Sequence, residues 1–283
     1  MSKNTRRNFV GQSAGALFGL SSVAWWNPKR SNRYTFSDPV VSSEFPSHNP
    51  EDVRAIVGAS HTRFEEVKEM VSARPELAKA AWDWGFGDWE SALGAASHMG
   101  RRDIAEVLIE HGARPNIYTF AMLGNVEAVK AMVESMPGVQ RIHGPHGFTL
   151  MHHAQIRLRY DDATELEKEN ANTLTDYLSS LGDADIRAVS LDITEEEQKA
   201  YMGQFTFGTL DDEVFTVELN SRGMLYMSRG DKIGRVLNRV DQHIFSPGGA
   251  ASVRIHFEVQ DGQAVSLTIH DPVPLVTATR REG

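Results

Sequence analysis

Apolar residues recur at helical spacing between residues 50 and 181, in short stripes that stop at a glycine or a proline. Three such stripes consist of Phe64, Val67, Met70 and Val71; of Ile104, Val107 and Leu108; and of Val126, Val129, Met132 and Val133. Each stripe occupies one face of a short helix, and such a helix cannot bury that face alone. The pattern therefore predicts short helices that bury their apolar faces against one another.

Short motifs recur between these stripes. A glycine turn followed by a helix with an acid in its first turn occurs at residues 100–104 and again, 24 residues later, at residues 124–128. The turn at residues 111–116 (HGARPN) resembles the finger turn of ankyrin repeats, residues 124–127 (GNVE) resemble the G-H-x-E of that family, and residues 149–154 (TLMHHA) are similar to its T-P-L-H-x-A. Leu150 stands where the family has proline.

The resemblance to ankyrin repeats covers roughly residues 50–186. The usual repeat has about 33 residues, whereas the corresponding anchors His61, Gly100 and Gly124 lie 39 and 24 residues apart, so the fingers differ in length. The resemblance implies an α-solenoid of about four ankyrin-type repeats over residues 51–186, of a family that binds other proteins.

The last helix of this region is expected to be longer than the others. Its apolar face carries Leu166, Leu174, Tyr177, Leu178 and Leu181, and Gly182 follows as a stop. Asp162 with Glu165 has the spacing of a capping box. A long final helix suits the terminal cap that a solenoid needs for solubility.

From residue 198 onward the apolar spacing changes from helical to alternating. Eight short runs alternate in this way and are separated by turn residues: 201–207, 214–219, 224–227, 235–240, 243–245, 253–259, 264–269 and 275–279. Eight short strands at close spacing predict an antiparallel β-barrel or half-barrel over residues 198–283, joined to the helices by a linker at residues 187–197. The complete fold class is therefore α+β.

The order of short motifs in this β domain resembles a known module. Tyr201-x-Gly203-x-Phe205, then Gly223-x-Leu225-Tyr226, then Asp261-Gly262 before Leu267 is similar to the lipocalin-like domain appended to some β-lactamase-like hydrolases of bacteria. The resemblance implies an accessory role for this domain. The Ser-x-x-Lys motif of those hydrolases does not occur in the sequence.

The N-terminus predicts export. Residues 5–10 (TRRNFV) resemble the twin-arginine signal, a weakly apolar run follows to Trp26, and Ser22-Val23-Ala24 fits a small-x-small cleavage site. The run is too short and too rich in glycine for a stable membrane span. We expect a signal peptide at residues 1–26, a flexible Ser/Pro/Asn-rich linker at residues 27–50, and a periplasmic protein.

Charge and composition exclude some partners and some chemistry. The 283-residue chain has a formal net charge of −9, and removing residues 1–24 takes away three basic residues and no acid, which gives −12. An acidic chain is unsuited to nucleic acid or anionic lipid. The chain has no cysteine, so a disulfide, a thiolate zinc site and a cysteine nucleophile are excluded.

Aromatic residues crowd the finger between the first two predicted repeats. The segment 81–89 (AWDWGFGDW) contains Trp82, Trp84, Phe86 and Trp89. Tryptophan is enriched at the centres of protein interfaces because it buries a large area with few rotatable bonds. We predict that these four residues bind a protein partner; alternatively, two of the rings cover the apolar end of the stack.

Four histidines, His143, His146, His152 and His153, lie close together in the sequence. Three imidazoles suffice for zinc, but His152 and His153 point to different faces of a helix, and His152 matches the ankyrin histidine that orders its turn by hydrogen bonding. We therefore expect no metal ion and no cofactor.

No catalytic motif is present among those searched. The sequence lacks G-x-S-x-G, a P-loop and H-E-x-x-H, and its acidic runs suit solvated surface. We expect no enzyme. The first hypothesis is an exported protein that mediates protein–protein interaction in the bacterial cell envelope. The alternative is a barrel that holds a small apolar ligand among Phe205, Phe207, Phe215, Tyr226, Phe245 and Phe257, although a barrel of this size is often filled by its own side chains.

Overall fold

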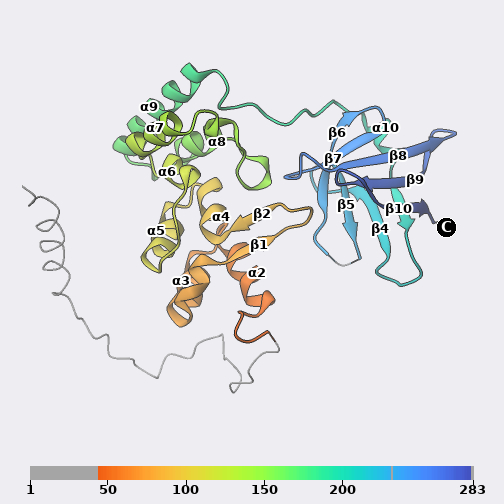
Figure 1. Ribbon diagram of the computed structural model, residues 1–283, viewed down its shortest axis with the longest axis horizontal. Coiled ribbons are helices and arrows are strands. Elements are labelled where there is room, and N and C mark those ends of the chain that lie inside the picture. Colours follow the sequence, from red (N-terminus) through yellow and green to blue (C-terminus); the bar gives the residue numbers. More distant parts are fainter. Residues whose placement is uncertain (1–43, 231, 282–283) are drawn as a thin grey trace, which may run out of the picture. The chain divides into compact units, whose positions relative to one another are not determined.

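The computed structural model describes residues 44–230 and 232–281 (Figure 1). The predicted signal peptide and residues 27–43 of the predicted linker lie outside these residues. By its internal contacts the chain divides into two units, Met1–Phe45 and Pro46–Gly283, and every described helix and strand belongs to the second.

The N-terminal part of this unit is helical. It contains, in order, α2 (Pro50–Ala59), α3 (Phe64–Ala73), η1 (Pro75–Lys79), β1 (Ala81–Asp83), β2 (Trp89–Ser91), α4 (Ala92–His98), α5 (Arg102–Glu110), α6 (Ile117–Met122), α7 (Val126–Ser135), η2 (Val139–Arg141), η3 (Pro145–Gly147), α8 (Leu150–Gln155), η4 (Ile156–Arg159) and α9 (Glu165–Leu181).

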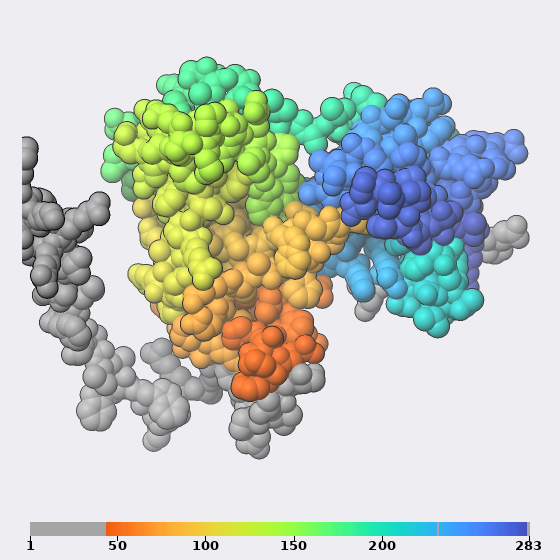
Figure 2. Space-filling model, in the orientation of Figure 1, coloured from red at the N-terminus to blue at the C-terminus, as the bar shows by residue number. Residues whose placement is uncertain are grey.

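The helices pack in consecutive pairs. Within the pairs α2 contacts α3, α4 contacts α5, α6 contacts α7 and α8 contacts α9; between pairs α2 contacts α4, α4 contacts α6 and α6 contacts α8. The colour of the chain accordingly runs from orange to green along the stack (Figures 1 and 2). Because each pair lies against the next, residues at similar positions in successive pairs become neighbours.

Buried side chains from several helices form the core of this stack. Ile56, Val67, Ile104 and Leu108 are fully buried in one cluster, and Val129, Leu150, Leu174 and Leu178 belong to a second. These residues include members of the helical stripes in the sequence. Full burial of each such side chain contributes about 1.5–3 kcal/mol.

Polar residues fix where the short helices begin. The side chains of Ser91, Asn116 and Thr149 accept hydrogen bonds from backbone N–H groups in the first turns of α4, α6 and α8. Helix α9 has a complete capping box, and it is made by Thr164 and Glu167. The prediction of Asp162 with Glu165 was wrong: the same spacing occurs two residues later, where a threonine hydroxyl accepts from the N3 backbone.

The C-terminal part is a closed antiparallel barrel with the strand order β10-β3-β4-β5-β6-β7-β8-β9. After the short helix α10 (Glu195–Lys199) its strands are β3 (Gly203–Thr206), β4 (Val214–Leu219), β5 (Leu225–Arg229), β6 (Arg235–Asp241), β7 (Ile244–Pro247), β8 (Arg254–Gln260), β9 (Gln263–His270) and β10 (Pro274–Arg280). Pairing of Thr206 with Thr279 and of Phe205 with Arg280 closes it.

The prediction of an α+β protein with an antiparallel barrel is confirmed, and the sheet closes fully. The alternation of apolar and polar residues along each run predicted the barrel correctly, because one face of each strand is buried. Phe205 and Phe245 are fully buried, and Tyr201 and Phe257 pack edge to face with Phe245 at ring-centroid distances of 4.8 and 5.5 Å. These aromatic side chains pack against one another in the interior of the barrel.

In the parts of the chain that the structure describes, every helix is too short or too polar to cross a membrane. The predicted lack of a stable membrane span agrees with this finding.

Candidate metal centre

The aromatic finger folds as a two-stranded hairpin. Strands β1 and β2 pair from Ala81 with Ser91 to Asp83 with Trp89. Its tip takes left-handed backbone at three successive residues, Gly85 (φ 113°), Phe86 (φ 60°) and Gly87 (φ 76°). Phe86 is strained there, since a side chain disfavours positive φ. The tight tip returns β2 along β1, which brings Glu90 beside the helices.

The hairpin distributes the four predicted partner-binding residues unequally. Trp82 and Trp84 are half-buried and pack against the helical core, and Phe86 packs against the core of the barrel. Trp89 is 64% exposed. One of the four aromatic rings is thus largely exposed.

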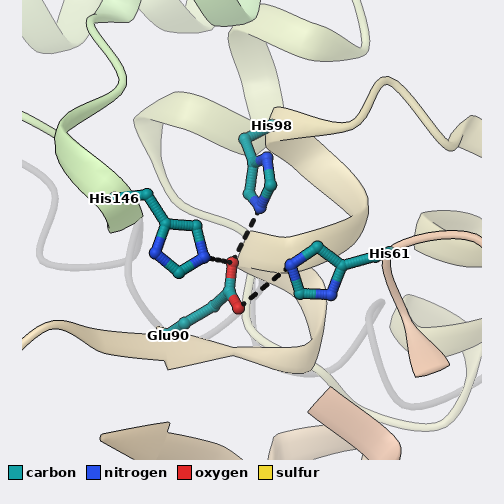
Figure 3. Close-up of side chains that lie close together, drawn as sticks. All are labelled: His61, Glu90, His98 and His146. Atoms are coloured by element: carbon teal, nitrogen blue, oxygen red, sulfur yellow. Dashed lines mark hydrogen bonds and ion pairs between the residues drawn. The ribbon is translucent and has the colours of Figure 1, made fainter. Parts of the chain in front are cut away.

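Three histidines and one glutamate meet beside this hairpin (Figure 3). His61 lies in the turn after α2, Glu90 is the central residue of β2, His98 ends α4, and His146 lies in the η3 turn. One ligand atom from each of the four lies within 4.8 Å of those of the other three. Four elements of the helical part therefore contribute one side chain each.

The carboxylate of Glu90 is the centre of the cluster and is completely buried. Its Oε1 atom lies 2.8 Å from Nε2 of His98 and 3.4 Å from Nε2 of His146. Its Oε2 atom lies 3.4 Å from Nε2 of His61 and accepts a hydrogen bond from Nε1 of Trp84 at 2.7 Å. All three imidazoles thus present the same nitrogen to one carboxylate.

The second nitrogens of two imidazoles are held by acceptors. Nδ1 of His61 lies 3.2 Å from the carbonyl oxygens of Val57 and Gly58, and Nδ1 of His146 lies 2.6 Å from Oδ2 of Asp88. Carbonyl and carboxylate oxygens only accept, so each Nδ1 carries the proton. In the neutral rings Nε2 therefore has a bare lone pair, and both lone pairs face the oxygens of Glu90.

This arrangement requires positive charge. If both rings were neutral, the Nε2 lone pairs of His61 and His146 would face an ionised carboxylate, which is unfavourable in a buried site; a proton on His146, or a metal ion in its place, removes this repulsion. The pKa values of His146 and Glu90 show that a proton on His146 stabilises the cluster. Burial opposes charge on His146, but hydrogen bonding to Asp88 and proximity to Glu90 raise its pKa to about 9. Burial likewise opposes ionisation of Glu90, yet contacts with His146 and His98 lower its pKa to about 2.

Asp88 supports the cluster from outside. Besides the imidazole, it accepts a hydrogen bond from the backbone N–H of His146 at 2.8 Å, and it forms an ion pair with Arg235. His146 itself has left-handed backbone (φ 59°), a strained conformation that these two hydrogen bonds help to hold. A carboxylate on the far nitrogen of a histidine is the usual second-shell partner of a metal ligand.

The residue types also fit a metal ion. Imidazole nitrogen with one carboxylate suits zinc and other divalent first-row metals. Bonds of about 2.0–2.2 Å in a tetrahedral shell put the donor atoms about 3.3–3.6 Å apart. The four donors lie within 4.8 Å of one another, and Nε2 of His98 lies 2.8 Å from Oε1 of Glu90. Shifts of at most about 1.5 Å between donors would therefore give such a shell.

Of the four histidines close in sequence, His146 alone joins the cluster. His143 contacts the carbonyl oxygen of Ile186, and Nδ1 of His153 donates to the carbonyl oxygen of Thr149. Nε2 of His152 lies 2.9 Å from the carbonyl oxygen of His98, so this ring links two helix ends by hydrogen bonding.

Sequence reasoning missed His61, Glu90 and His98. The four residues of the cluster, with His146 as the last, are 29, 8 and 48 residues apart along the chain, and this spacing matches no metal motif. One signal was available. His61 stands at a predicted repeat anchor, and His98 lies two residues before the next predicted anchor, Gly100. Stacked helix pairs place such positions side by side, so an alignment of the predicted repeats puts these two imidazoles close together.

Comparison of the chain with protein-family models, with curated proteins and with solved structures gives no match. The chemistry of the site therefore rests on its own geometry.

Proposed function

We propose that the helical part binds one divalent transition metal ion of the zinc class through His61, Glu90, His98 and His146. The observation that carries this proposal is the convergence of three Nε2 atoms on the buried carboxylate of Glu90. A metal ion would take the place of the proton that stabilises His146 beside Glu90 and would bind the three Nε2 atoms and the carboxylate directly. Binding would displace the proton of His146, so metal affinity should fall as pH decreases.

Titration of the metal-free protein with Zn²⁺ in a calorimeter tests the proposal. We expect one ion per chain in the wild type. Glu90→Gln keeps the shape and an acceptor for Trp84 but removes the charged ligand, so it should lower the affinity by more than the roughly 10–100-fold that a second-shell change costs. Asp88→Asn, which removes only the carboxylate behind His146, should fall within that 10–100-fold range.

The matched control is His111→Asn. Nδ1 of His111 contacts the carbonyl oxygen of Val107 at 2.8 Å, in the same helical stack but outside the cluster. Its affinity for Zn²⁺ should equal that of the wild type. Equal binding by the wild type and Glu90→Gln, or no binding by the wild type, would refute the proposed site.

A second candidate function is protein binding, and the exposure of Trp89 favours it. The helix pairs and the hairpin between the first two pairs support a stack of the ankyrin type, whose fingers contact proteins. Trp82 and Trp89 line a shallow cleft of about 260 Å³ together with Pro50 and Val53. Such a cleft suits an apolar side chain of a protein partner.

The same proposal includes export. The twin-arginine motif at Arg6 and Arg7 would carry the folded chain to the periplasm, where the β domain would be an accessory module. Replacement of both arginines by lysine should leave the protein in the cytoplasm, as cell fractionation with a blot against the chain would show. Periplasmic recovery of the double variant at wild-type level would count against this route. The alternative of an apolar ligand inside the barrel has less support, since the aromatic side chains of its interior pack on one another.

A further inference from the structure

The four residues of the metal centre differ in their access to solvent. Glu90 and His98 form a closed floor, with side chains 0% and 3% exposed. His61 and His146 form a rim, with side chains 25% and 23% exposed. A metal ion held among the four donors is therefore enclosed by protein on the floor side and lies nearest to solvent on the rim side.

The two rim imidazoles do not contact each other face to face. Their ring planes are inclined by only 23° and their centroids lie 6.1 Å apart, which is well beyond direct stacking contact. The Nδ1 atoms of both rings are engaged by Val57, Gly58 and Asp88. The rings are thus held by their outer edges, and their metal-facing edges are separated.

Trp84 restricts Glu90 to one ligand atom. The indole Nε1–H only donates, and it donates to Oε2 at 2.7 Å. This hydrogen bond uses one lone pair of Oε2 and so favours Oε1 as the ligand, in which case the carboxylate takes one coordination position rather than two. The protein then supplies four donors at most, and zinc-class ions also accept five.

One of the two rim residues is strained. His146 has a φ value of 59°, and strain of this kind concentrates where a binding site fixes the backbone. The donor set is also three imidazoles with a carboxylate and no thiolate, whereas closed structural zinc sites are rich in cysteine. Both features favour a site that exchanges a ligand over one that only stabilises the fold.

We infer that the bound metal ion keeps one coordination position open on the side of His61 and His146, and that this position takes an exchangeable oxygen or small-anion ligand such as water or a carboxylate. This inference rests on the proposed function, because it concerns the same ion. It assigns the rim of the cluster, rather than the barrel interior, as the place where a small molecule is recognised.

Cobalt substitution tests the open position. Co²⁺ added to the metal-free protein should give visible d–d bands with one ion per chain, and Zn²⁺ should abolish them by competition. Azide or acetate added next should shift and weaken these bands in a saturable manner, since a fifth ligand raises the coordination number. If saturating azide and acetate leave the bands unchanged, the open position is refuted but the metal site is not. If Co²⁺ gives no bands, the metal site itself is refuted.

Trp84→Phe provides a second, independent test, with Trp82→Phe as the matched control. Without the indole N–H, Oε2 becomes free to bind the ion, so Trp84→Phe should bind Co²⁺ but show a smaller band shift with azide. Trp82→Phe should respond as the wild type does. Far-ultraviolet circular dichroism of both variants serves to check that they are folded. An equal azide response in all three proteins would contradict the role given to Trp84.

Discussion

The histidines of the helical part differ in what surrounds their ring nitrogens. His61, His98 and His146 share the carboxylate of Glu90, which stabilises positive charge among them. His153 is fully buried, its ring packs at a tilt of 43° against that of Tyr118, and Nδ1 makes a single polar contact with the carbonyl oxygen of Thr149. Burial lowers the pKa of His153 to about 3. One residue type therefore serves a charged cluster in one place and an apolar core in another.

His153 should make folding sensitive to acid. Its folded pKa of about 3 lies below the unfolded value of about 6.5, so the unfolded chain binds more protons between these values and the free energy of unfolding falls as pH decreases. Between pH 7 and pH 5 this residue should cost about 2 kcal/mol. Urea denaturation at both pH values should show a smaller loss for His153→Asn, whose amide keeps a donor to Thr149 and does not titrate.

His111→Asn again provides the control, because the exchange is the same and His111 is only half-buried. It should lose as much stability as the wild type between pH 7 and pH 5. If His153→Asn and the wild type lose equal free energy over this interval, His153 is not the acid-sensitive group.

At the scale of the element, the helices of this stack are short and depend on their ends. Helices α4, α6 and α8 have seven, six and six residues, and each begins at a polar cap. Helices of this length are unstable in isolation, so caps and packing against neighbours hold them. Helix α9, with 17 residues, is the exception and has the reciprocal cap of Thr164 and Glu167.

Removal of the α9 cap should destabilise the protein. Thr164→Ala deletes the hydroxyl that accepts from the backbone N–H of Glu167 at 3.2 Å, and loss of such a cap costs about 0.5–2 kcal/mol. Asp162→Ala is the control, since Asp162 is exposed and contacts Arg157 at 3.3 Å; such exposed pairs contribute about 0–1 kcal/mol. The free energy of unfolding is measured by guanidinium denaturation. If Asp162→Ala lowers it more than Thr164→Ala does, Asp162 rather than Thr164 caps the helix.

The eight strands of the barrel could be predicted from the local sequence pattern. Each predicted run lies within a residue or two of an observed strand or its flanking turn, because alternation of buried and exposed side chains is recorded in the sequence itself. The hairpin of β1 and β2 was not predicted as strands. Its residues do not alternate cleanly, and its geometry depends on left-handed backbone at Gly85, Phe86 and Gly87.

At the scale of the whole molecule, the described chain combines a helical stack and a closed barrel with cores of their own. The stack presents the metal centre and the exposed indole of Trp89, whereas the barrel buries its aromatic side chains. Both proposals, recognition of a partner and binding of an ion, therefore concern the helical part.

Trp89→Ala should abolish capture of a protein partner without loss of stability. Trp89 is 64% exposed, so its removal opens no cavity, whereas a tryptophan at the centre of an interface contributes about 2 kcal/mol or more to binding. The measurement is a pull-down from the cell envelope with the wild type and the variant, together with thermal unfolding of both. Leu166→Ala, at an equally exposed apolar residue on α9 (65%), should capture the partner normally. Capture by Trp89→Ala at wild-type level would remove the finger from the interface.

The sequence by itself determined the period of each segment, and hence the helices, the eight strands and the change from one to the other near residue 198. It did so because each helix or strand buries one face, so that apolar residues recur along the sequence with the period of that element. The tertiary structure alone decided that His61, Glu90, His98 and His146 meet, since their meeting depends on how the helix pairs stack and on a strained hairpin tip. No spacing along the chain records the distance between side chains that the stacking brings together.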